Sequence, residues 1–499
     1  MRYLPNGTWM GKADAYTIEQ LGIPSIVLME HAALKTVEAM EQEAIDLGKV
    51  LIVCGSGNNG GDGFAVARLL KQKGCSVTVL FTGKESSMSP ECKIQAHAVR
   101  CLGIPIVTEL PDESFPLVVD AIFGVGLNRE IQGHYKELIQ QLNELPGQKV
   151  AVDIPSGIHA GTGQVLGVAF QADLTVSFQC EKLGTVLFPG KSFAGKVLPA
   201  DIGIQENIFA KEREVCYTLD LADVPSLLPR RKANSHKGSY GKVLMITGSE
   251  GMAGAAYLSA KAAYTCGAGL VQIYTPTSNR VVLQQLLPEA IVTTYEDFDQ
   301  KHLRELLEWA DVICIGCGFG QSEVSHQILK CVLTHRQVPC VVDADGINLL
   351  SCSMEYVIPN SDPLILTPHL KEMSRLTGCS VAEIQEKRFQ ILDEFCNHYD
   401  AVCVLKDART VVAREGKQYF VNTAGNQSMA KAGSGDVLAG VITGMLAGHL
   451  EPYDAAVAGV YLHACGGDHA KETLGSYSVL AEDLIAHIGA VIKEAEDTI

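Results

Sequence analysis

Short apolar runs alternate with helical stretches along most of this chain, and that alternation limits the folds it can adopt. From Val50 onward the strand-like runs are KVLIVC, CSVTVLF, LVVDAIF, KVAVDIP and DLTVSF. After residue 240 a second series contains KVLMITG, LVQIYTP, DVICIG, CVVDADG, LILTPH and AVCVLKD. Strands separated by helices form mostly parallel sheets with helices on both faces. The sequence therefore predicts an α/β protein.

The first series weakens after Asp201, and the charged segment 205–228 that follows has no sustained period. We expect this segment to be an irregular linker and place a domain boundary near residue 215. The 499 residues then divide into 1–215 and 216–499, and each part suits one layered domain. In the second, larger domain, two long helices rich in small residues are expected from about Gly435 and Asp454.

The charge of the chain excludes some partners. Lys and Arg number 40 against 57 Asp and Glu, a net charge of −17, so no global basic field exists to hold nucleic acid or an anionic membrane. No stretch reaches the roughly 18 apolar residues that a membrane helix needs. The first residues lack the apolar core of a signal peptide, and 16 scattered cysteines fit reduced thiols. We expect a cytoplasmic protein that binds neither nucleic acid nor membrane.

Residues 55–60, GSGNNG, lie between an expected strand and an expected helix, as in a dinucleotide-binding turn. Glycine amides at a helix N-terminus can hold a pyrophosphate. However, the next strand lacks the acidic residue that usually binds the ribose, and Asn58, Asn59 and Asp62 add side-chain oxygens that a phosphate does not need. The alternative is a tight turn that binds no ligand.

Two further expected strands end in carboxylates, at Asp120 and Asp153. Because the carboxyl ends of parallel strands share one edge of a sheet, we expect Asn59, Asp120 and Asp153 to meet in a crevice. Asn59, Asp120 and the Ser156 hydroxyl are oxygen ligands that suit a hard cation better than zinc. A remaining carboxylate can transfer a proton. The alternative is that each Asp only caps the turn that follows it.

The motifs NNGGDGFAVAR, DAIFGVGLNREI and VDIPSGIHAGTG, in this order, resemble the YjeF N-terminal family, the NAD(P)H-hydrate epimerases, over roughly residues 9–212. The resemblance implies a three-layer Rossmann-like αβα domain that binds a damaged nicotinamide nucleotide. It implies that Asp153 is catalytic and that Asn59, Asp120 and Ser156 hold a potassium ion. The residues implied to contact the hydrate are Asn58, Asn59, Gly60, Gly61, Asp62, Gly124, Val125, Gly126, Leu127, Asn128, Arg129, Glu130 and Asp153.

Residues 432–440, AGSGDVLAG, lead into an apolar helix in the second half of the chain. Glycine amides at a helix start form an anion hole, and Asp436 could take the proton from a hydroxyl that attacks a phosphoryl group. The P-loop pattern does not occur in the sequence. The alternative is a glycine-containing helix cap in which Asp436 only interacts with the helix dipole.

The order LILTPHLKEMSRLTG, VLKDARTVV and NTAGNQSMAKAGSGD resembles the ribokinase-like superfamily. Adding HKGSYGKVLMITGS, GMAGAAYLSAKAAYTCGAGLV and GCGFG narrows the resemblance to the YjeF C-terminal family, the nucleotide-dependent (S)-NAD(P)H-hydrate dehydratases, over roughly residues 225–496. The resemblance implies hydrate contacts at Ala255, Gly318, His369 and Asp436, with Asp436 as catalytic base. It implies adenine-nucleotide contacts at Lys406, Asp407, Ala408, Arg409, Thr410 and Gly435. Phosphoryl transfer in general implies Mg²⁺.

Together these features predict a bifunctional nicotinamide-nucleotide repair enzyme, an isomerase and a lyase in one chain. The first domain would interconvert the R and S hydrates, and the second would dehydrate the S form with ADP or ATP. The fusion resembles the prokaryotic arrangement, which implies ADP. The alternative is a ribokinase-like small-molecule kinase with an N-terminal nucleotide-binding scaffold domain. We also expect a homo-oligomer.

Several other residues occur in patterns that resemble metal sites, but structural roles are favoured for them. Cys314 and Cys317 form C-x-x-C without a second pair at zinc spacing, so we predict a packed core pair. His463, Asp468 and His469 do not share one helix face, and we predict structural roles for them. Because the chain is acidic, its anionic ligands must be held locally, by backbone amides at 55–61 and 433–435, by Lys406 and by a bound cation.

Overall fold

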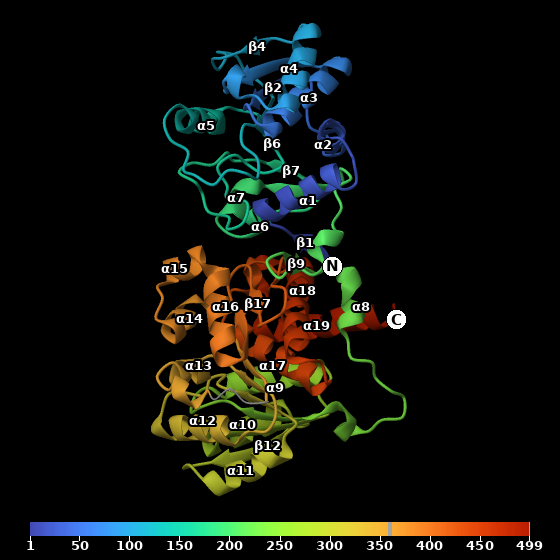
Figure 1. The fold of residues 1–499 in the computed structure, drawn as a ribbon. Helices are drawn as coiled ribbons and strands as arrows, with labels where there is room; N and C mark the ends of the chain where they lie inside the picture. The colour runs from blue at the N-terminus through green and yellow to red at the C-terminus, as the bar shows by residue number, and fades with distance from the viewer. Residues whose placement is uncertain (358–361, 499) are drawn as a thin grey trace. The chain divides into compact units, whose positions relative to one another are not determined.

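The computed structural model describes residues 1–357 and 362–498, and Figure 1 shows the order of their helices and strands. The chain divides into two compact units, Arg2–Tyr217 and Thr218–Ile499, the second of which also includes Met1. Each unit contains a largely parallel sheet with helices packed against it, so the predicted α/β class is confirmed. Among the described helices, none combines the length and the apolar character that crossing a membrane requires.

The sheet of the N-terminal unit is parallel throughout. In spatial order its strands are β4 (Ile106–Val107), β3 (Ser76–Phe81), β2 (Lys49–Cys54), β5 (Leu117–Ala121), β6 (Gln148–Val152), β7 (Leu174–Phe178) and β8 (Lys196–Ala200). The chain runs outward from β2 in one direction and from β5 in the other. The strand order therefore reverses between β2 and β5, and open α/β sheets bind ligands at such a point.

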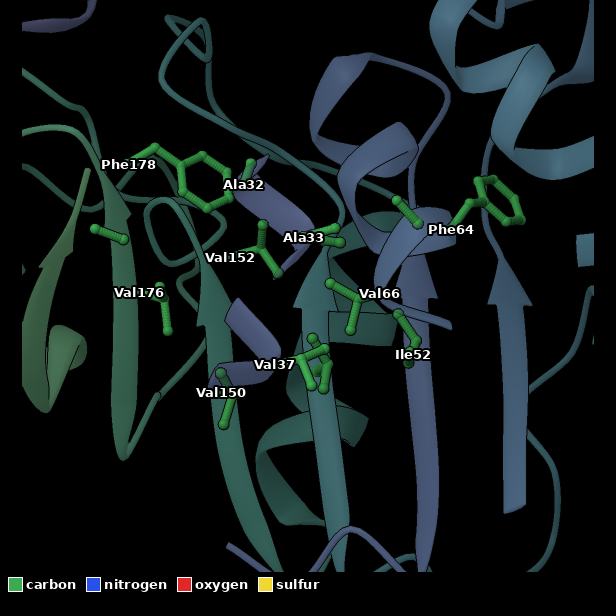
Figure 2. Packing of buried hydrophobic residues seen from close by; sticks show 14 of the residues in the cluster. Ala32, Ala33, Val37, Ile52, Phe64, Val66, Val150, Val152, Val176 and Phe178 are labelled. Carbon is green, nitrogen blue, oxygen red and sulfur yellow. The ribbon is translucent and has the colours of Figure 1, made fainter. Parts of the chain in front are cut away.

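Both faces of this sheet are buried, which explains why its strands are almost continuously apolar. The helices of the unit are α1 (Gly7–Glu19), α2 (Ser25–Gln42), α3 (Asn58–Gln72), α4 (Pro90–Cys101), α5 (His134–Glu144), α6 (Leu183–Val186) and α7 (Gly190–Ala194). Figure 2 shows side chains of α2 and α3, among them Val37 and Val66, packed against Ile52, Val150 and Val176 of the strands. On the opposite face, alternate strand residues such as Leu51 pack with residues of α5.

In the sheet of the C-terminal unit the strands from β12 to β16 are parallel, and β17 and β18 continue the sheet in antiparallel pairing. In spatial order its strands are β12 (Ile291–Tyr295), β11 (Leu270–Pro276), β10 (Lys242–Ile246), β13 (Val312–Ile315), β14 (Cys340–Val342), β15 (Leu364–Leu366), β16 (Ala401–Leu405), β17 (Val411–Ala413) and β18 (Phe420–Val421). The order reverses between β10 and β13. Strands β4, β8, β12, β17 and β18 were not predicted, because they are short or, like β12, only partly buried.

The helices of the C-terminal unit include both long helices that the sequence predicted. They are α8 (Val224–Leu227), α9 (Ala253–Thr265), α10 (Arg280–Leu286), α11 (Gln300–Trp309), α12 (Glu323–His335), α13 (Asp345–Leu350), α14 (Leu370–Thr377), α15 (Val381–Glu386), α16 (Arg388–Tyr399), α17 (Ser434–Ala447), α18 (Pro452–Ser478) and α19 (Ala481–Glu496). Helix α17 is buried from Val437 to its end and packs against α9 and α18. A Cβ on Gly440 would lie 2.1 Å from the Ser259 oxygen, so the small residues allow this close packing.

The segment 205–228 is not the irregular linker that we expected. It contains β9 (Cys216–Thr218) and α8, and the side chains of Val215, Cys216 and Val224 are buried. The buried residues of this segment follow neither a helix period nor a strand period. A further short strand, β1, comprises Arg2–Leu4.

Candidate active sites

A cavity of about 370 Å³ lies at the carboxyl ends of the strands in the N-terminal unit. One part of its wall is apolar and comprises Met10, Leu28, Met29, Ala32, Phe178, Ile202 and Ile204. Another part carries the carboxyl groups of Asp14, Asp62, Glu91 and Asp153 together with the ammonium group of Lys182. The cavity therefore offers a flat apolar ligand both contact surface and several groups that can exchange protons.

Asp153 follows β6 and has a left-handed backbone, with φ of +68°. Its Oδ1 accepts hydrogen bonds from the Phe178 amide at 3.0 Å and from the Lys182 ammonium. Lys182 is fully buried and also donates to the Phe178 carbonyl at 2.6 Å. These contacts hold the Asp153 carboxylate in one orientation at the cavity wall. Lys182 was not predicted from the sequence, because no local pattern relates it to a carboxylate 29 residues away.

Two other carboxyl groups of this cavity retain their protons to higher pH than usual. Burial raises the pKa of Asp62 well above its ordinary value, and the nearby charges of Asp153 and Asp14 raise it further, while Lys182 opposes them. Burial also raises the pKa of Asp14, with smaller contributions from Asp153 and Glu91. A protonated Asp62 can donate a hydrogen bond, which an ionised carboxylate cannot do.

Asp120 and Ser156 are in direct contact at the carboxyl end of β5. The Ser156 hydroxyl donates to Asp120 Oδ1 at 2.7 Å, and the Ser156 amide donates to Oδ2 at 2.7 Å. Burial raises the pKa of Asp120 to about 6, although hydrogen bonds from Ser156 and Ile122 oppose that rise. The amide nitrogen of Asn59 is buried and has no hydrogen-bond partner among the described residues. The oxygens of the buried Asp120 carboxylate, of the Ser156 hydroxyl and of the Asn59 side-chain amide are the ligand type that suits a hard cation.

The structure divides the predicted hydrate contacts of the N-terminal unit into two groups. The cavity is lined by Asn58, Asn59, Asp62, Gly124, Val125, Gly126 and Asp153, whereas its lining among the described residues does not include Gly60, Gly61, Leu127, Asn128, Arg129 or Glu130. Gly60 serves close packing, since an added Cβ would lie 1.9 Å from the Gly55 oxygen. The amides of Gly55 and Gly61 donate to backbone carbonyls. The expectation that amides throughout 55–61 hold an anion is therefore wrong for these two.

In the C-terminal unit, side chains that follow three strands converge on Asp343, which follows a fourth. Its Oδ1 accepts from the Lys406 ammonium at 2.5 Å and from the Thr367 hydroxyl at 2.6 Å. The thiol of Cys317 lies 3.8 Å from its Oδ2. Asp343 was not predicted as a site residue, although in CVVDADG it is a strand-end carboxylate like Asp120 and Asp153. Strand-end position was therefore a usable signal here.

Asp436 lies in the first turn of α17. The residue that precedes this helix, Gly433, is its N-cap and has φ of +91°. Burial and the neighbouring Asp343 raise the pKa of Asp436 to about 6, while Cys317 and Lys406 lower it. Burial lowers the pKa of Lys406, but Asp343 and Glu372 outweigh burial and raise it overall. Asp436 can therefore accept a proton near neutral pH beside a permanent positive charge.

The N-terminus of α17 brings the predicted anion hole to this cluster. A Cβ on Gly435 would lie 3.7 Å from the Lys406 Nζ and 3.9 Å from Asp343 Oδ2. The Ser434 amide donates to the Lys431 carbonyl at 3.3 Å, so it is not free for a ligand. A helix N-terminus next to a lysine suits a phosphate group.

Ala255 and Gly318, which were both predicted to contact the hydrate, lie against each other. Gly318 has φ of +57°, and an added Cβ would lie 2.6 Å from the Ala255 Cβ. His369 caps α14, and its Nδ1 accepts from the amides of Lys371 and Glu372. Its side chain is 49% exposed, and its backbone forms a bridge with that of Lys406. The latter pairing brings His369 to the strand ends that carry the cluster.

The predicted nucleotide loop, 406–410, is held by contacts of its own residues. Asp407 accepts from Arg388 at 3.0 Å and from the Ala408 amide at 2.8 Å. Arg409 donates to the Thr423 carbonyl at 3.0 Å, and the Thr410 hydroxyl donates to the Asp407 carbonyl at 3.3 Å. These hydrogen bonds define the shape of the loop.

The three residues of α18 whose side chains could ligate a metal contact different partners. The ring of His463 lies 3.3 Å from the Ser434 hydroxyl, and burial lowers its pKa to about 4. Asp468 accepts from the Gly425 amide and the Asn426 side chain, whereas His469 lies 3.2 Å from His487. Cys314 and Cys317 are both fully buried, as expected for a core pair. The contact between Cys317 and Asp343 was not predicted.

Comparisons with known proteins identify both units. The family model described as YjeF-related protein N-terminus matches residues 25–184, and that described as NAD(P)H-hydrate dehydratase matches residues 243–489. A bifunctional NAD(P)H-hydrate repair enzyme of Moorella thermoacetica is 38% identical, and the alignment covers 100% of this chain and 98% of the relative. Its counterpart in Escherichia coli is 34% identical, with 98% and 95% covered.

Solved structures resemble the C-terminal unit. The ADP/ATP-dependent NAD(P)H-hydrate dehydratase of Bacillus subtilis, co-crystallised with ATP and Mg²⁺, is 34% identical with a TM-score of 0.51, covering 55% of this chain and 97% of that one. A ribokinase-like superfamily protein of Enterococcus faecalis is 30% identical with a TM-score of 0.51, covering 56% and 96%. The protein is thus a fusion of a YjeF-type N-terminal domain with a ribokinase-like domain. The chain belongs to the family of bifunctional NAD(P)H-hydrate repair enzymes.

Proposed function

We propose that residues 1–215 form an NAD(P)H-hydrate epimerase domain and that residues 216–499 form an ADP-dependent (S)-NAD(P)H-hydrate dehydratase domain. The first interconverts the R and S hydrates, and the second returns the S form to NAD(P)H while ADP gives AMP and phosphate. The observation that carries the proposal is the presence of two different sites. One is a carboxyl-lined cavity around Asp153, and the other is a base, Asp436, at a helix N-terminus beside Lys406.

The epimerase step needs little more than proton transfer. A hydroxyl at C6 next to the ring nitrogen is a hemiaminal, which can lose and regain its oxygen through an iminium or ring-opened form. Asp153 is proposed to shuttle the proton, and Lys182 to hold its carboxylate in position. The carboxyl-rich wall would repel a pyrophosphate, so the hydrated nicotinamide ring is the part that enters the cavity. The contacts proposed for the ring are Asn58, Asn59, Asp62, Gly124, Val125 and Gly126, which line the cavity. Those proposed for the rest of the hydrate are Gly60, Gly61, Leu127, Asn128, Arg129 and Glu130.

A potassium ion is proposed at Asn59, Asp120 and Ser156. The all-oxygen donor set and the buried Asp120 carboxylate support it, because a cation there would compensate a charge that burial disfavours. When bound, the ion would supply positive charge next to Asn59, which lines the cavity.

Dehydration requires a better leaving group than hydroxide. Phosphorylation of the C6 hydroxyl provides one, and the ring nitrogen then expels phosphate to restore the dihydropyridine. Asp436 is proposed to accept the hydroxyl proton, while the N-terminus of α17 and Lys406 stabilise charge on the transferred group. Ala255, Gly318 and His369 are proposed to contact the hydrate. Lys406, Asp407, Ala408, Arg409, Thr410 and Gly435 are proposed to contact the adenine nucleotide.

Mg²⁺ is expected with the nucleotide, and the Asp343 carboxylate is the group that would help to hold it. It offers the oxygen ligands that Mg²⁺ prefers, and its Oδ2 is not used by Lys406 or Thr367. When bound, Mg²⁺ supplies charge neutralisation for the phosphates. ADP is favoured over ATP by the two-domain fusion, and a comparison of the two donors measures this preference.

We also infer a homo-oligomer that acts in the cytoplasm. The exposed apolar side chains of Val281, Val282, Leu286 and Ile291 on α10 and β12 support association. Light scattering of the purified protein tests the first inference, and cell fractionation tests the second.

The decisive experiment incubates the full-length protein with mixed R and S hydrates and either ADP or ATP. The expected result is complete recovery of the reduced-nicotinamide absorbance with one donor. Asp153→Asn should leave the R form unconverted, whereas Asp436→Asn should block dehydration but still interconvert R and S. An accumulating phosphate ester without recovered absorbance would instead support a small-molecule kinase.

A further inference from the structure

The C-terminal site contains a thiol that the proposed chemistry does not use. Cys317, Asp343 and Asp436 each point one ligand atom into a common space, and these atoms lie within 4.8 Å of one another. We propose that these three side chains form a binding site for a thiophilic divalent cation of the Zn²⁺ and Cd²⁺ class.

The geometry brings together three separate segments of the chain. Cys317 follows β13, Asp343 follows β14, and Asp436 lies in the first turn of α17. Lys406 and Thr367 occupy Oδ1 of Asp343, which leaves Oδ2 facing the Cys317 sulfur at 3.8 Å. Zinc ligands at roughly 2.0–2.3 Å from the metal lie about 3.5 Å apart. The three ligand atoms therefore need only small side-chain movements to bind a common ion.

The site has an entrance. Cys317 and Asp343 are buried, but Asp436 is only partly buried. It lies in the first turn of α17, whose first residues, Ser434 and Gly435, are also partly exposed. An ion can therefore approach from the Asp436 side, where the nucleotide phosphates are proposed to bind. A water or a phosphate oxygen can complete the coordination.

The donor set distinguishes this ion from Mg²⁺. Mg²⁺ takes oxygen ligands and does not favour sulfur, whereas one thiolate with two carboxylates suits Zn²⁺ or Cd²⁺. Binding converts the Cys317 thiol to a thiolate, and the released proton passes to the solvent. With Cys317, the C-terminal site should bind thiophilic metals more tightly than a site of carboxylates alone would.

Occupation of this site would have one functional consequence, which rests on the proposed function. A metal that coordinates Asp436 removes it as a base, so Zn²⁺ should inhibit dehydration in competition with Mg²⁺, and a chelator should reverse the inhibition. Epimerisation by the N-terminal domain should continue. The binding itself does not depend on the reaction and is measured without substrate.

Cadmium titration of the full-length protein tests the site, because cadmium-bound thiolate has a characteristic ultraviolet absorption. The exposed Cys101 and Cys352 are replaced by serine in every protein compared. Cys317→Ser should remove one thiolate from the absorption and weaken Cd²⁺ binding by about tenfold or more. Cys266→Ala is the matched control, a buried thiol outside the cluster, and should bind Cd²⁺ as the parent does. Equal binding by the Cys317→Ser protein, or equal loss in the control, would overturn the proposal.

A second variant, Asp436→Asn, retains the thiol and removes one carboxylate ligand. It should still give the thiolate absorption, but with Cd²⁺ affinity lowered by about tenfold; unchanged affinity would exclude Asp436 from the site. The two inferences fail separately. If Cd²⁺ binds through Cys317 but does not inhibit, the site stands and Asp436 is not the base. If Cd²⁺ does not bind while dehydration proceeds with Mg²⁺, the metal site is wrong and the proposed function stands.

Discussion

The ammonium group of Lys182 donates a hydrogen bond to the carboxylate of Asp153 inside the N-terminal unit. Lys182 is fully buried, and Asp153 is 8% exposed. Each charged group is therefore stabilised by the other, because water cannot hydrate a buried group that has lost its partner. This pair connects the stability of the unit to the orientation of its proposed catalytic group.

Lys182→Met should destabilise the N-terminal unit by about 3–5 kcal/mol, the cost of leaving a buried charge without its partner. Epimerisation should fall as well, while dehydration of pure S hydrate continues. Denaturant unfolding and a separate assay of each activity measure these effects. The control is Lys196→Met, which removes an exposed lysine paired with Glu43 and should cost about 0–1 kcal/mol. Equal stability of the two variants would contradict the role of the buried pair.

The dehydration rate should depend on pH through Asp436. A base must be ionised to accept a proton, and the pKa of this group is raised to about 6. The rate should therefore rise with pH through about 6 and level off above it. Lys406 lowers the pKa of Asp436, so Lys406→Met should shift the acidic limb to higher pH as well as lowering the rate. A pH profile of kcat/KM in both proteins checks the direction, and a shift to lower pH would be inconsistent with this arrangement.

Potassium should stabilise the N-terminal unit and activate epimerisation. At a concentration 100 times its Kd, a bound ion adds about 2.7 kcal/mol to the free energy of unfolding. Thermal unfolding in K⁺ and in Li⁺ compares the two ions at equal ionic strength. Asp120→Asn should abolish the difference, whereas Asp112→Asn, which changes an exposed carboxylate, should preserve it. A K⁺ effect that survives Asp120→Asn would place the ion elsewhere.

Gly318→Ala should impair dehydration without affecting epimerisation. The added Cβ would lie 2.6 Å from the Ala255 Cβ, and φ of +57° disfavours any side chain, at roughly 1–2 kcal/mol. The double variant Gly318→Ala with Ala255→Gly removes the steric contact but not the backbone strain. It should recover part of the lost stability, measured by thermal unfolding of the C-terminal unit. Full activity of the single variant would show that the hydrate does not need this close approach.

Much of the fold was predictable because both parallel sheets are buried on two faces. Strands in that position are nearly continuous apolar runs, so β2, β5, β10 and β13 were visible in the sequence. Strands β12 and β17 were missed because edge position or short length weakens that pattern. In the segment 205–228, scattered apolar residues are buried without any period, so a linker was predicted where β9 and α8 occur.

The local motifs of the sequence were enough to indicate the α/β class, the family and the positions of Asp153 and Asp436, since strand ends and helix starts are encoded by neighbouring residues. The residues that pair with these groups could not be predicted from local motifs. Lys182 lies 29 residues from Asp153 and Lys406 lies 63 residues from Asp343. Their contacts depend on the order in which strands pair, which follows from packing the whole sheet. The same packing brings Cys317 to two carboxylates and turns a predicted core thiol into a proposed metal ligand.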